Sequence, residues 1–179
     1  CADDVISVAA YASGWVASSG ASVGGAMASF SSQGPRYDGV MKPDIAAPGV
    51  SIGAAISSYT DASFSSVESV EFNSRTYHFA KLSGTSMAAP MVTGIAALLL
   101  QAKPELTATE IKQILLSTAR EDTKTGILPN EGDPKWGHGK VDAMAAIREA
   151  LNLGLHKISE DFSFKVYPNP VRKNLHLDE

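Results

Sequence analysis

Ser86 stands where a hydroxyl group could attack a carbonyl carbon. It follows Gly84 and Thr85 and opens a stretch that carries no charged residue until Lys103. Glycine allows a sharp turn and a close backbone approach. If a helix begins here, its first N–H groups lack intrahelical partners and the positive end of its dipole lies beside the hydroxyl. A serine so placed could attack a carbonyl while its own N–H holds the oxyanion that forms.

A plainer interpretation is that Ser86 only caps the helix, a role that serine fills often. Pro90 follows in the same stretch. We predict that it falls at about the end of the first turn, where its missing N–H costs little. At this point the residues leave both the capping role and the catalytic role open.

The stretch from 82 to 104 is apolar around almost its whole circumference. A helix of this kind is either buried in a domain or spans a membrane. The length suffices for a span, which needs roughly 20 residues. Its first half, however, contains serine, threonine, glycine and proline, which is too much polar and helix-breaking content for lipid. We therefore predict a buried central helix and no membrane span.

The segment GTSMAAPMVTGIAALLL, residues 84–100, resembles the nucleophile segment of the subtilisin-like serine proteases. Three further segments are similar to that family in the family's order: ASFSSQGP at 28–35, KPDIAAPGVSI at 42–52 and WGHGKVDAMAAI at 136–147. The resemblance implies an α/β fold, namely the C-terminal half of a subtilisin-like three-layer fold with a parallel sheet. It also implies a serine endopeptidase in which Ser86 is the catalytic nucleophile and Gly84, Thr85 and Met87 form the nucleophile and oxyanion loop.

The residues that should assist this serine are not evident. Acyl transfer by serine needs a base within hydrogen-bond reach and a carboxylate that orients the base. In the family that the chain resembles, both precede the serine. The histidine upstream of Ser86 is His78, which matches no histidine motif of that family, and no upstream aspartate or Asn73 matches either. We expect the base, its orienter and the oxyanion asparagine to come from an N-terminal half of the same domain. The chain alone is then inactive on its polypeptide substrate.

Three alternatives to an active subtilisin-like half remain. Gly84-x-Ser86 could be the elbow of an α/β-hydrolase, with Asp122 or Asp133 and His138 following, although Ala88 stands where the second glycine should be. The acid-active sedolisin family shares an SGTS segment, but the MAAP continuation favours the subtilisin side. A degenerate scaffold that only binds peptides is the third possibility.

Acidic residues elsewhere have plainer interpretations. Asp44, in KPD, is predicted to serve a structural turn. Tyr37 and Asp38 lie in a turn where some members of the resembled family bind a cation. One acid makes a poor calcium site, because calcium takes six to eight oxygens. We expect no metal or other cofactor at these residues, and a structural calcium elsewhere cannot be inferred from the sequence.

Hydrophobic patterning predicts strands and helices in alternation, which indicates a layered α/β fold. Residues 5–11 read as a buried parallel strand and residues 45–56 as two strands around Pro48 and Gly49. Residues 57–74 read as a polar surface insertion. Residues 77–82 then form the strand that leads to Ser86.

Two later helices carry start signals. Thr107 and Glu110 form a capping box, with Leu106 against Ile111 as its hydrophobic staple. Isoleucine and leucine at 111, 114 and 115 then share one helical face. A third helix is predicted from Asp142, as its cap, through residue 151, with Gly154 as its stop.

Composition bounds the remaining possibilities. The chain has 179 residues, 15 Lys and Arg, 19 Asp and Glu, and a net charge of −4. No basic run is present, so we expect no nucleic-acid partner. Cys1 is the single cysteine, which excludes a disulfide within the chain. No signal-peptide pattern opens the sequence.

Composition changes after residue 153, and we divide the chain there. Residues 1–153 are assigned to the peptidase domain and residues 154–179 to a linker and β-rich segment. Phe162, Phe164 and Val166 alternate with polar residues, and a turn follows. A β-hairpin tail is one interpretation. FKVYPNPVRKNLHL also resembles the opening of the C-terminal sorting domain of the type IX secretion system of Bacteroidetes, which implies export to the cell surface or medium.

Overall fold

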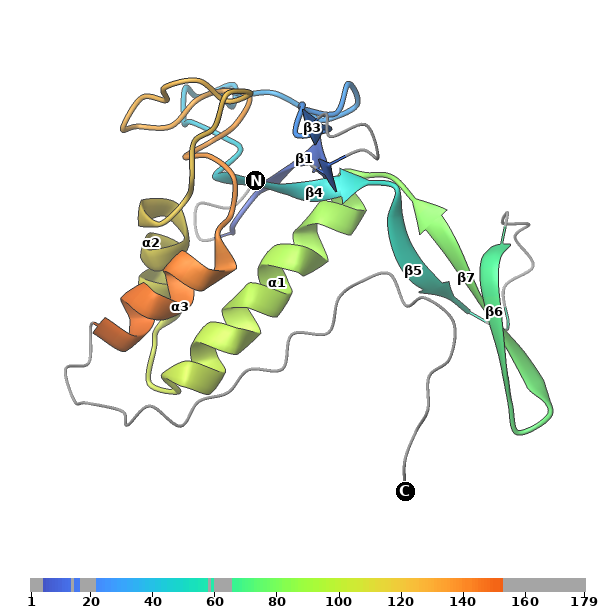
Figure 1. The fold of residues 1–179 in the computed structure, drawn as a ribbon. Coiled ribbons are helices and arrows are strands. Elements are labelled where there is room, and N and C mark those ends of the chain that lie inside the picture. Colours follow the sequence, from blue (N-terminus) through green and yellow to red (C-terminus); the bar gives the residue numbers. More distant parts are fainter. Residues whose placement is uncertain (1–4, 14, 17–21, 58, 60–65, 153–179) are drawn as a thin grey trace.

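The computed structural model describes residues 5–13, 15–16, 22–57, 59 and 66–152. Its elements, in chain order, are the strands β1 (Val8–Ala12), β2 (Trp15–Val16), β3 (Ser22–Val23), β4 (Ile45–Val50), β5 (Ile52–Ile56), β6 (Ser66–Phe72) and β7 (Arg75–Leu82), and the helices α1 (Thr85–Ala102), α2 (Ala108–Ser117) and α3 (Ala143–Asn152). Figure 1 shows a parallel strand pair with the three helices on one side, from which a separate antiparallel arm extends.

The parallel pair consists of β1 and β4, with Val8 opposite Ile45 and Tyr11 opposite Pro48; the register then shifts by one residue at Gly49, so that Ala12 lies opposite Val50. The alanines in the middle of both strands are buried. Strands of parallel sheets are covered on their faces and therefore read as apolar runs. The prediction of a buried parallel strand near the start of the chain is confirmed, although β1 begins three residues later than expected.

The two strands predicted within residues 45–56 are present, but the break between them was misplaced. β4 continues through Pro48 and Gly49, and the chain turns at Ser51, whose φ is 54°. Proline removes a ladder donor and is confined to places where none is needed. Beyond a bridge from Ala46 to Lys140, no other described segment pairs with that edge of β4. The missing N–H of Pro48 therefore breaks no ladder bond there.

The arm is a three-stranded antiparallel sheet in the order β5, β7, β6. Asn73 and Ser74 join β6 to β7, with φ values of 49° and 58°. Two consecutive positive φ angles make the two-residue turn that best matches strand twist. Much of the predicted surface insertion is thus a regular hairpin, while residues 58 and 60–65 lie outside the described part. β7 ends at Leu82, as predicted, and leads directly to α1.

The predicted start of α2 is confirmed. Thr107 Oγ1 accepts from Glu110 N at 3.3 Å, and Glu110 Oε2 accepts from Thr107 N at 2.8 Å. Leu106 and Ile111 are both buried in the main hydrophobic cluster, in agreement with the predicted staple. This local pattern sets the direction in which α2 leaves the loop after α1.

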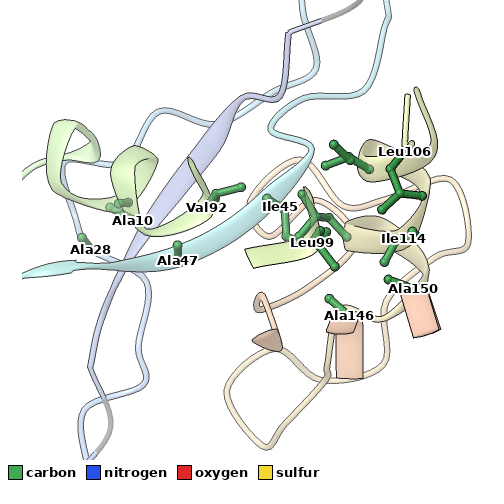
Figure 2. Close-up of a cluster of buried hydrophobic side chains, with 13 residues drawn as sticks. Ala10, Ala28, Ile45, Ala47, Val92, Leu99, Leu106, Ile114, Ala146 and Ala150 are labelled. Carbon is green, nitrogen blue, oxygen red and sulfur yellow. The ribbon is translucent and has the colours of Figure 1, made fainter. Parts of the chain in front are cut away.

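Helix α3 also begins as predicted, because Asp142 Oδ1 accepts from Ala145 N at 2.9 Å. Its buried Ala146 and Ala150 belong to the same hydrophobic cluster as Leu99 of α1 and Ile114 of α2, which Figure 2 shows together. Small residues at these positions let α3 lie close to α1. The predicted stop at Gly154 lies outside the described residues.

The predicted central helix is present as α1, and within the described residues it is buried on one face only. Its buried residues are Ala88, Val92 and Leu99, which face β1, β4 and α3. Met91 and Leu98 are 39% exposed and Leu100 is 40% exposed. By length and composition α1 could cross a membrane, a test that core helices also pass. The described residues simply contain nothing that covers its second apolar face.

The Asp44 carboxylate binds several polar groups from separate parts of the chain. Its Oδ2 accepts from Ser7 N at 2.7 Å, Ser7 Oγ at 2.8 Å and Lys42 Nζ at 2.6 Å. Its Oδ1 lies 3.1 Å from Lys112 Nζ on α2. Burial raises the pKa of Asp44, but the hydrogen bonds from Lys42, Ser7 and Lys112 together lower it by more than burial raises it. The pKa of Asp44 is therefore below its ordinary value. The role of Asp44 is structural, as expected, but it joins distant segments of the chain rather than closing a turn.

We predict that Asp44→Asn lowers the free energy of unfolding at pH 7 by about 3 kcal/mol, because it leaves the buried ammonium group of Lys42 and the partly buried one of Lys112 without their carboxylate. A depressed folded-state pKa contributes stability above the unfolded value, about 3.9, and loses it as the pH falls. The difference between wild type and variant should therefore shrink below about pH 4. Urea unfolding at pH 7 and pH 3 measures both effects.

The matched control for this comparison is Asp142→Asn, since asparagine caps helices as well as aspartate does and should cost less than about 0.5 kcal/mol. An Asp44→Asn loss that equals this control at pH 7, or that stays constant down to pH 3, would contradict the prediction.

Candidate active site

The chain places Ser86 at the mouth of α1. The helix begins at Thr85, its N-cap is Gly84, and no side chain accepts a capping hydrogen bond. The interpretation of Ser86 as the cap is therefore wrong. Ser86 is the second residue of the helix, and it is exposed. Its hydroxyl is free to meet a molecule that approaches from solvent.

Helix geometry determines what surrounds this hydroxyl. Met87 N donates to the Gly84 carbonyl at 3.0 Å. The N–H groups of Thr85 and Ser86 have no intrahelical acceptor, because the first four donors of a helix lack one. These donors and the positive end of the helix dipole favour negative charge at this point. An oxyanion formed on attack by Ser86 would lie beside them.

The prediction for Pro90 is wrong. Pro90 lies inside α1, beyond the four positions whose N–H groups lack intrahelical partners. Its missing N–H would otherwise donate to the carbonyl of Ser86, four residues earlier. Proline in a helix interior therefore removes a bond that the helix would have made. The carbonyl oxygen that loses its hydrogen bond here is that of Ser86, the candidate nucleophile.

Met87 packs against the loop that precedes α1. Its side chain is half-buried, and its sulfur would lie 3.5 Å from a Cβ atom built on Gly84. The four candidate residues 84–87 therefore form one compact turn of chain. Met87 borders this turn, and its thioether is the atom most open to oxidation there.

The arm does not supply a base in an evident position. His78 is exposed on β7, paired with Ile56 on one side and Ser69 on the other. No hydrogen bond or ion pair joins His78 to an aspartate or glutamate among the described residues. Nothing in its surroundings matches the orienting carboxylate that a catalytic histidine needs.

The residues of the α/β-hydrolase alternative serve other purposes. His138 Nδ1 lies 3.2 Å from the Asp44 carbonyl oxygen, and His138 N donates to the same oxygen at 3.0 Å. Asp133 accepts from the backbone N–H groups of Lys135 and Trp136 at 2.8 Å and 2.9 Å. These are turn and packing contacts.

A buried lysine was missed by the sequence reasoning. Lys140 is 1% exposed, and its Nζ donates to Gly25 O and to Asp122 Oδ2, both at 2.6 Å. It also lies 4.7 Å from the ring centroid of Tyr11 and 5.0 Å from that of Trp136. Asp122 is thus held by Lys140 rather than by a histidine. The signal available was a lysine inside an apolar segment that also contains tryptophan.

In the turn around Tyr37, the Asp38 carboxylate is bound by groups of the chain itself. The hydrogen bond from Arg36 to the Asp38 carboxylate lowers the pKa of Asp38 to about 2, and Val40 N donates to the same group. Within the part of the chain that the structure describes, no three histidine, cysteine or acidic side chains gather as a metal site would require.

Comparison with known proteins decides the family. A profile described as the subtilase family matches residues 1–139. The chain belongs to the subtilase family. It is 38% identical over 153 residues to a subtilisin-like protease of Arabidopsis thaliana, SBT4.8, covering 84% of this chain and 21% of that protein. It is 47% identical over 90 residues to the serine protease AprX of Bacillus subtilis, covering 50% of this chain and 19% of that protein.

Solved protease structures share the fold. The CspB protease of Clostridium perfringens superposes with a TM-score of 0.56 at 26% identity, over 84% of this chain and 27% of that one. Fervidolysin of Fervidobacterium pennivorans, described as a keratinolytic enzyme related to subtilisin, gives a TM-score of 0.52 at 33% identity, over 81% of this chain and 19% of that one. The α/β-hydrolase alternative is left without support, and the chain spans about a fifth of the length of the curated relatives it matches.

The position of Met87 predicts sensitivity to oxidation. If Ser86 is the nucleophile of a peptidase, peroxide should convert the Met87 thioether to a bulkier, polar sulfoxide beside it and slow both fluorophosphonate labelling of Ser86 and peptide hydrolysis. These rates are to be measured before and after peroxide treatment in the parent protein, meaning this chain together with the N-terminal half that the sequence leads us to expect. After peroxide treatment, a Met87→Ala parent should keep the labelling and hydrolysis rates that it had before treatment. The control Met144→Ala, which removes an exposed methionine of α3, should show the same decrease in both rates as wild type. Equal losses in both variants would rule out Met87 as the cause.

Proposed function

We propose that this chain is the C-terminal half of a subtilisin-like catalytic domain, and that Ser86 is the nucleophile of a serine endopeptidase. The observation that carries the proposal is the exposed Ser86 side chain at the second position of α1, in a chain of the subtilase family. The substrate is a polypeptide. Gly84, Thr85 and Met87 form the loop around the nucleophile.

In this mechanism the hydroxyl of Ser86 attacks the scissile carbonyl as a histidine base removes its proton. The oxyanion of the tetrahedral intermediate accepts from the Ser86 N–H, and a side-chain amide from upstream adds a second donor. The base then passes the proton to the departing amine, and water releases the acyl group from Ser86. The base, the aspartate that orients it and the amide are proposed to belong to sequence upstream of this chain.

The open face of α1 supports an N-terminal half as the partner. Burying an apolar side chain fully is worth about 1.5–3 kcal/mol, so a helix that exposes several apolar residues gains from a second layer. Met91 and Leu98, seven residues apart, border the buried stripe of α1 on one flank, and Leu100 borders it on the other. We propose that the missing half of the catalytic domain packs against them. This half also carries the rest of the catalytic machinery.

We also propose the domain division and location that the sequence suggested. Residues 1–153 form the peptidase part, and residues 154–179, which lie outside the described residues, open a C-terminal sorting domain of the type IX secretion kind. The protein is then exported to the cell surface or the medium. No cofactor is needed for acyl transfer by serine, and we propose none.

The proposal predicts that the 179-residue chain alone hydrolyses no peptide, whereas the parent protein does. Ser86→Ala in the parent should lower kcat by roughly a million-fold, the size found when the serine of a subtilisin is removed. Hydrolysis of a fluorogenic peptide library measures both. Turnover by the isolated chain at ordinary protease rates would refute the missing-half proposal.

A fluorophosphonate probe separates the enzyme from a peptide-binding scaffold. The parent protein should be labelled at Ser86, as mass spectrometry of the labelled peptide would show, because a base activates the hydroxyl. Ser117→Ala, which removes a hydroxyl at the end of α2, is the control and should be labelled as wild type is. An unlabelled parent would favour the scaffold.

The partner proposal predicts that Leu98, although partly exposed in this chain, is buried in the parent. Leu98→Lys there should destabilise the protein by about 3 kcal/mol or more, because it buries an unpaired charge. Ile127→Lys replaces a residue that is 95% exposed and should change stability by less than about 0.5 kcal/mol. Equal unfolding midpoints in urea for the two variants would mean that nothing covers this face of α1.

A further inference from the structure

The end of β4 holds the loop that precedes the nucleophile. Gly84 N donates to the Gly49 carbonyl at 2.8 Å, and Ser51 N donates to Ser83 Oγ at 2.9 Å. One bond joins two backbones, and the other uses a side-chain hydroxyl. The two bonds fasten both residues that lie between the end of β7 and the start of α1.

Gly49 also touches this loop directly. A Cβ atom at position 49 would lie 2.8 Å from the Gly84 carbonyl oxygen, 2.7 Å from Ala10 Cβ and 3.2 Å from Ala88 Cβ. Real Cβ atoms essentially never show contacts below 3.0 Å, so something would have to shift. Gly49 has no positive φ. Glycine is therefore needed here for close approach rather than for an unusual backbone conformation.

The strand that makes these contacts is fixed in turn. β4 is paired with β1 on both sides of Gly49, which a register shift leaves without a partner residue in β1. Ala46 N donates to Gly139 O, and Val141 N donates to Ala46 O, both at 2.9 Å. The Asp44 carboxylate binds the residues around the start of the strand. Because the loop before α1 is bound to β4, its position is fixed by the most buried part of the fold and not by the exposed arm.

We propose that Gly49 and Ser83 are positioning residues that hold the Gly84 turn and so fix where Ser86 presents its hydroxyl. This inference rests on the proposed role of Ser86 as nucleophile. Neither residue needs to touch the substrate. Displacing a reacting group by about 1 Å can lower a rate about 100-fold, so the effect falls on kcat and leaves KM unchanged.

The first test uses Ser83 in the parent protein, because this exposed side chain can be changed without disturbing the core. Ser83→Ala removes the acceptor for Ser51 N and should lower kcat roughly tenfold at constant KM, a part of the loss that a full displacement would give. Ser83→Thr keeps the hydroxyl and should restore most of kcat. Equal kcat in wild type and Ser83→Ala, or no rescue by threonine, would overturn the role of Ser83.

The second test uses Gly49→Ala, which should lower kcat about 100-fold at constant KM. Gly53→Ala is the matched control, because it adds the same methyl group in the neighbouring strand, where nothing lies within 4 Å. Combining Gly49→Ala with Ala10→Gly removes the 2.7 Å contact but keeps the 2.8 Å contact with the Gly84 carbonyl oxygen. The double variant should therefore regain part of the lost thermal stability but none of the lost kcat, and recovery of kcat would assign the effect to packing against Ala10 alone.

Two further measurements separate failure of this inference from failure of the proposed function. Fluorophosphonate labelling of Ser86 in the wild-type parent tests the function. Hydrogen exchange at the Gly84 amide tests the clamp without any catalysis, and Gly49→Ala should increase its rate at least tenfold relative to Gly53→Ala. A labelled parent whose Gly49→Ala variant exchanges faster but reacts at the wild-type rate would overturn the inference while leaving the proposed function intact.

Discussion

The fold depends on one close approach, that of the start of α1 to the middle of β1 and β4. Small residues at the contact, Ala10, Ala47, Ala88 and Gly49, make it possible. Close packing of this kind tolerates little change in volume. It brings a helix mouth against the end of a rigid parallel strand, so the residue that follows the turn is presented in one orientation. The polar network around Asp44 keeps that strand in place from its other end.

Features set by neighbouring residues could be predicted from the sequence. The capping box of α2 is an interaction over three residues, and the cap of α3 by Asp142 spans the same distance. The strand leading to Ser86 and the helix that follows it were also predicted, because the apolar run and the Gly84 turn are local signals. The family itself could be predicted from four motifs in order, which the family match confirms.

Features set by distant parts of the chain could not be predicted in the same way. The apolar circumference of α1 indicated full burial, but burial depends on what is packed against a helix, and here one layer is present. Pro48 suggested a break in β4, yet its cost depends on whether a strand lies alongside. The role of Lys140 depends on Gly25 and Asp122, which are far from it in sequence. The links from Gly49 to Gly84 and from Ser51 to Ser83 were missed for the same reason.

The one-sided cover of α1 has a consequence for biosynthesis, if the upstream half is its missing layer. A ribosome makes the layer that carries the base before it makes the serine. The two-stranded core around β1 and β4 then packs against an upstream half that has already been synthesised. Ser86, the last catalytic group in chain order, reaches its position only when α1 folds onto that core. Such an enzyme is inactive for most of its own synthesis, which protects the nascent chain and neighbouring proteins from premature cleavage.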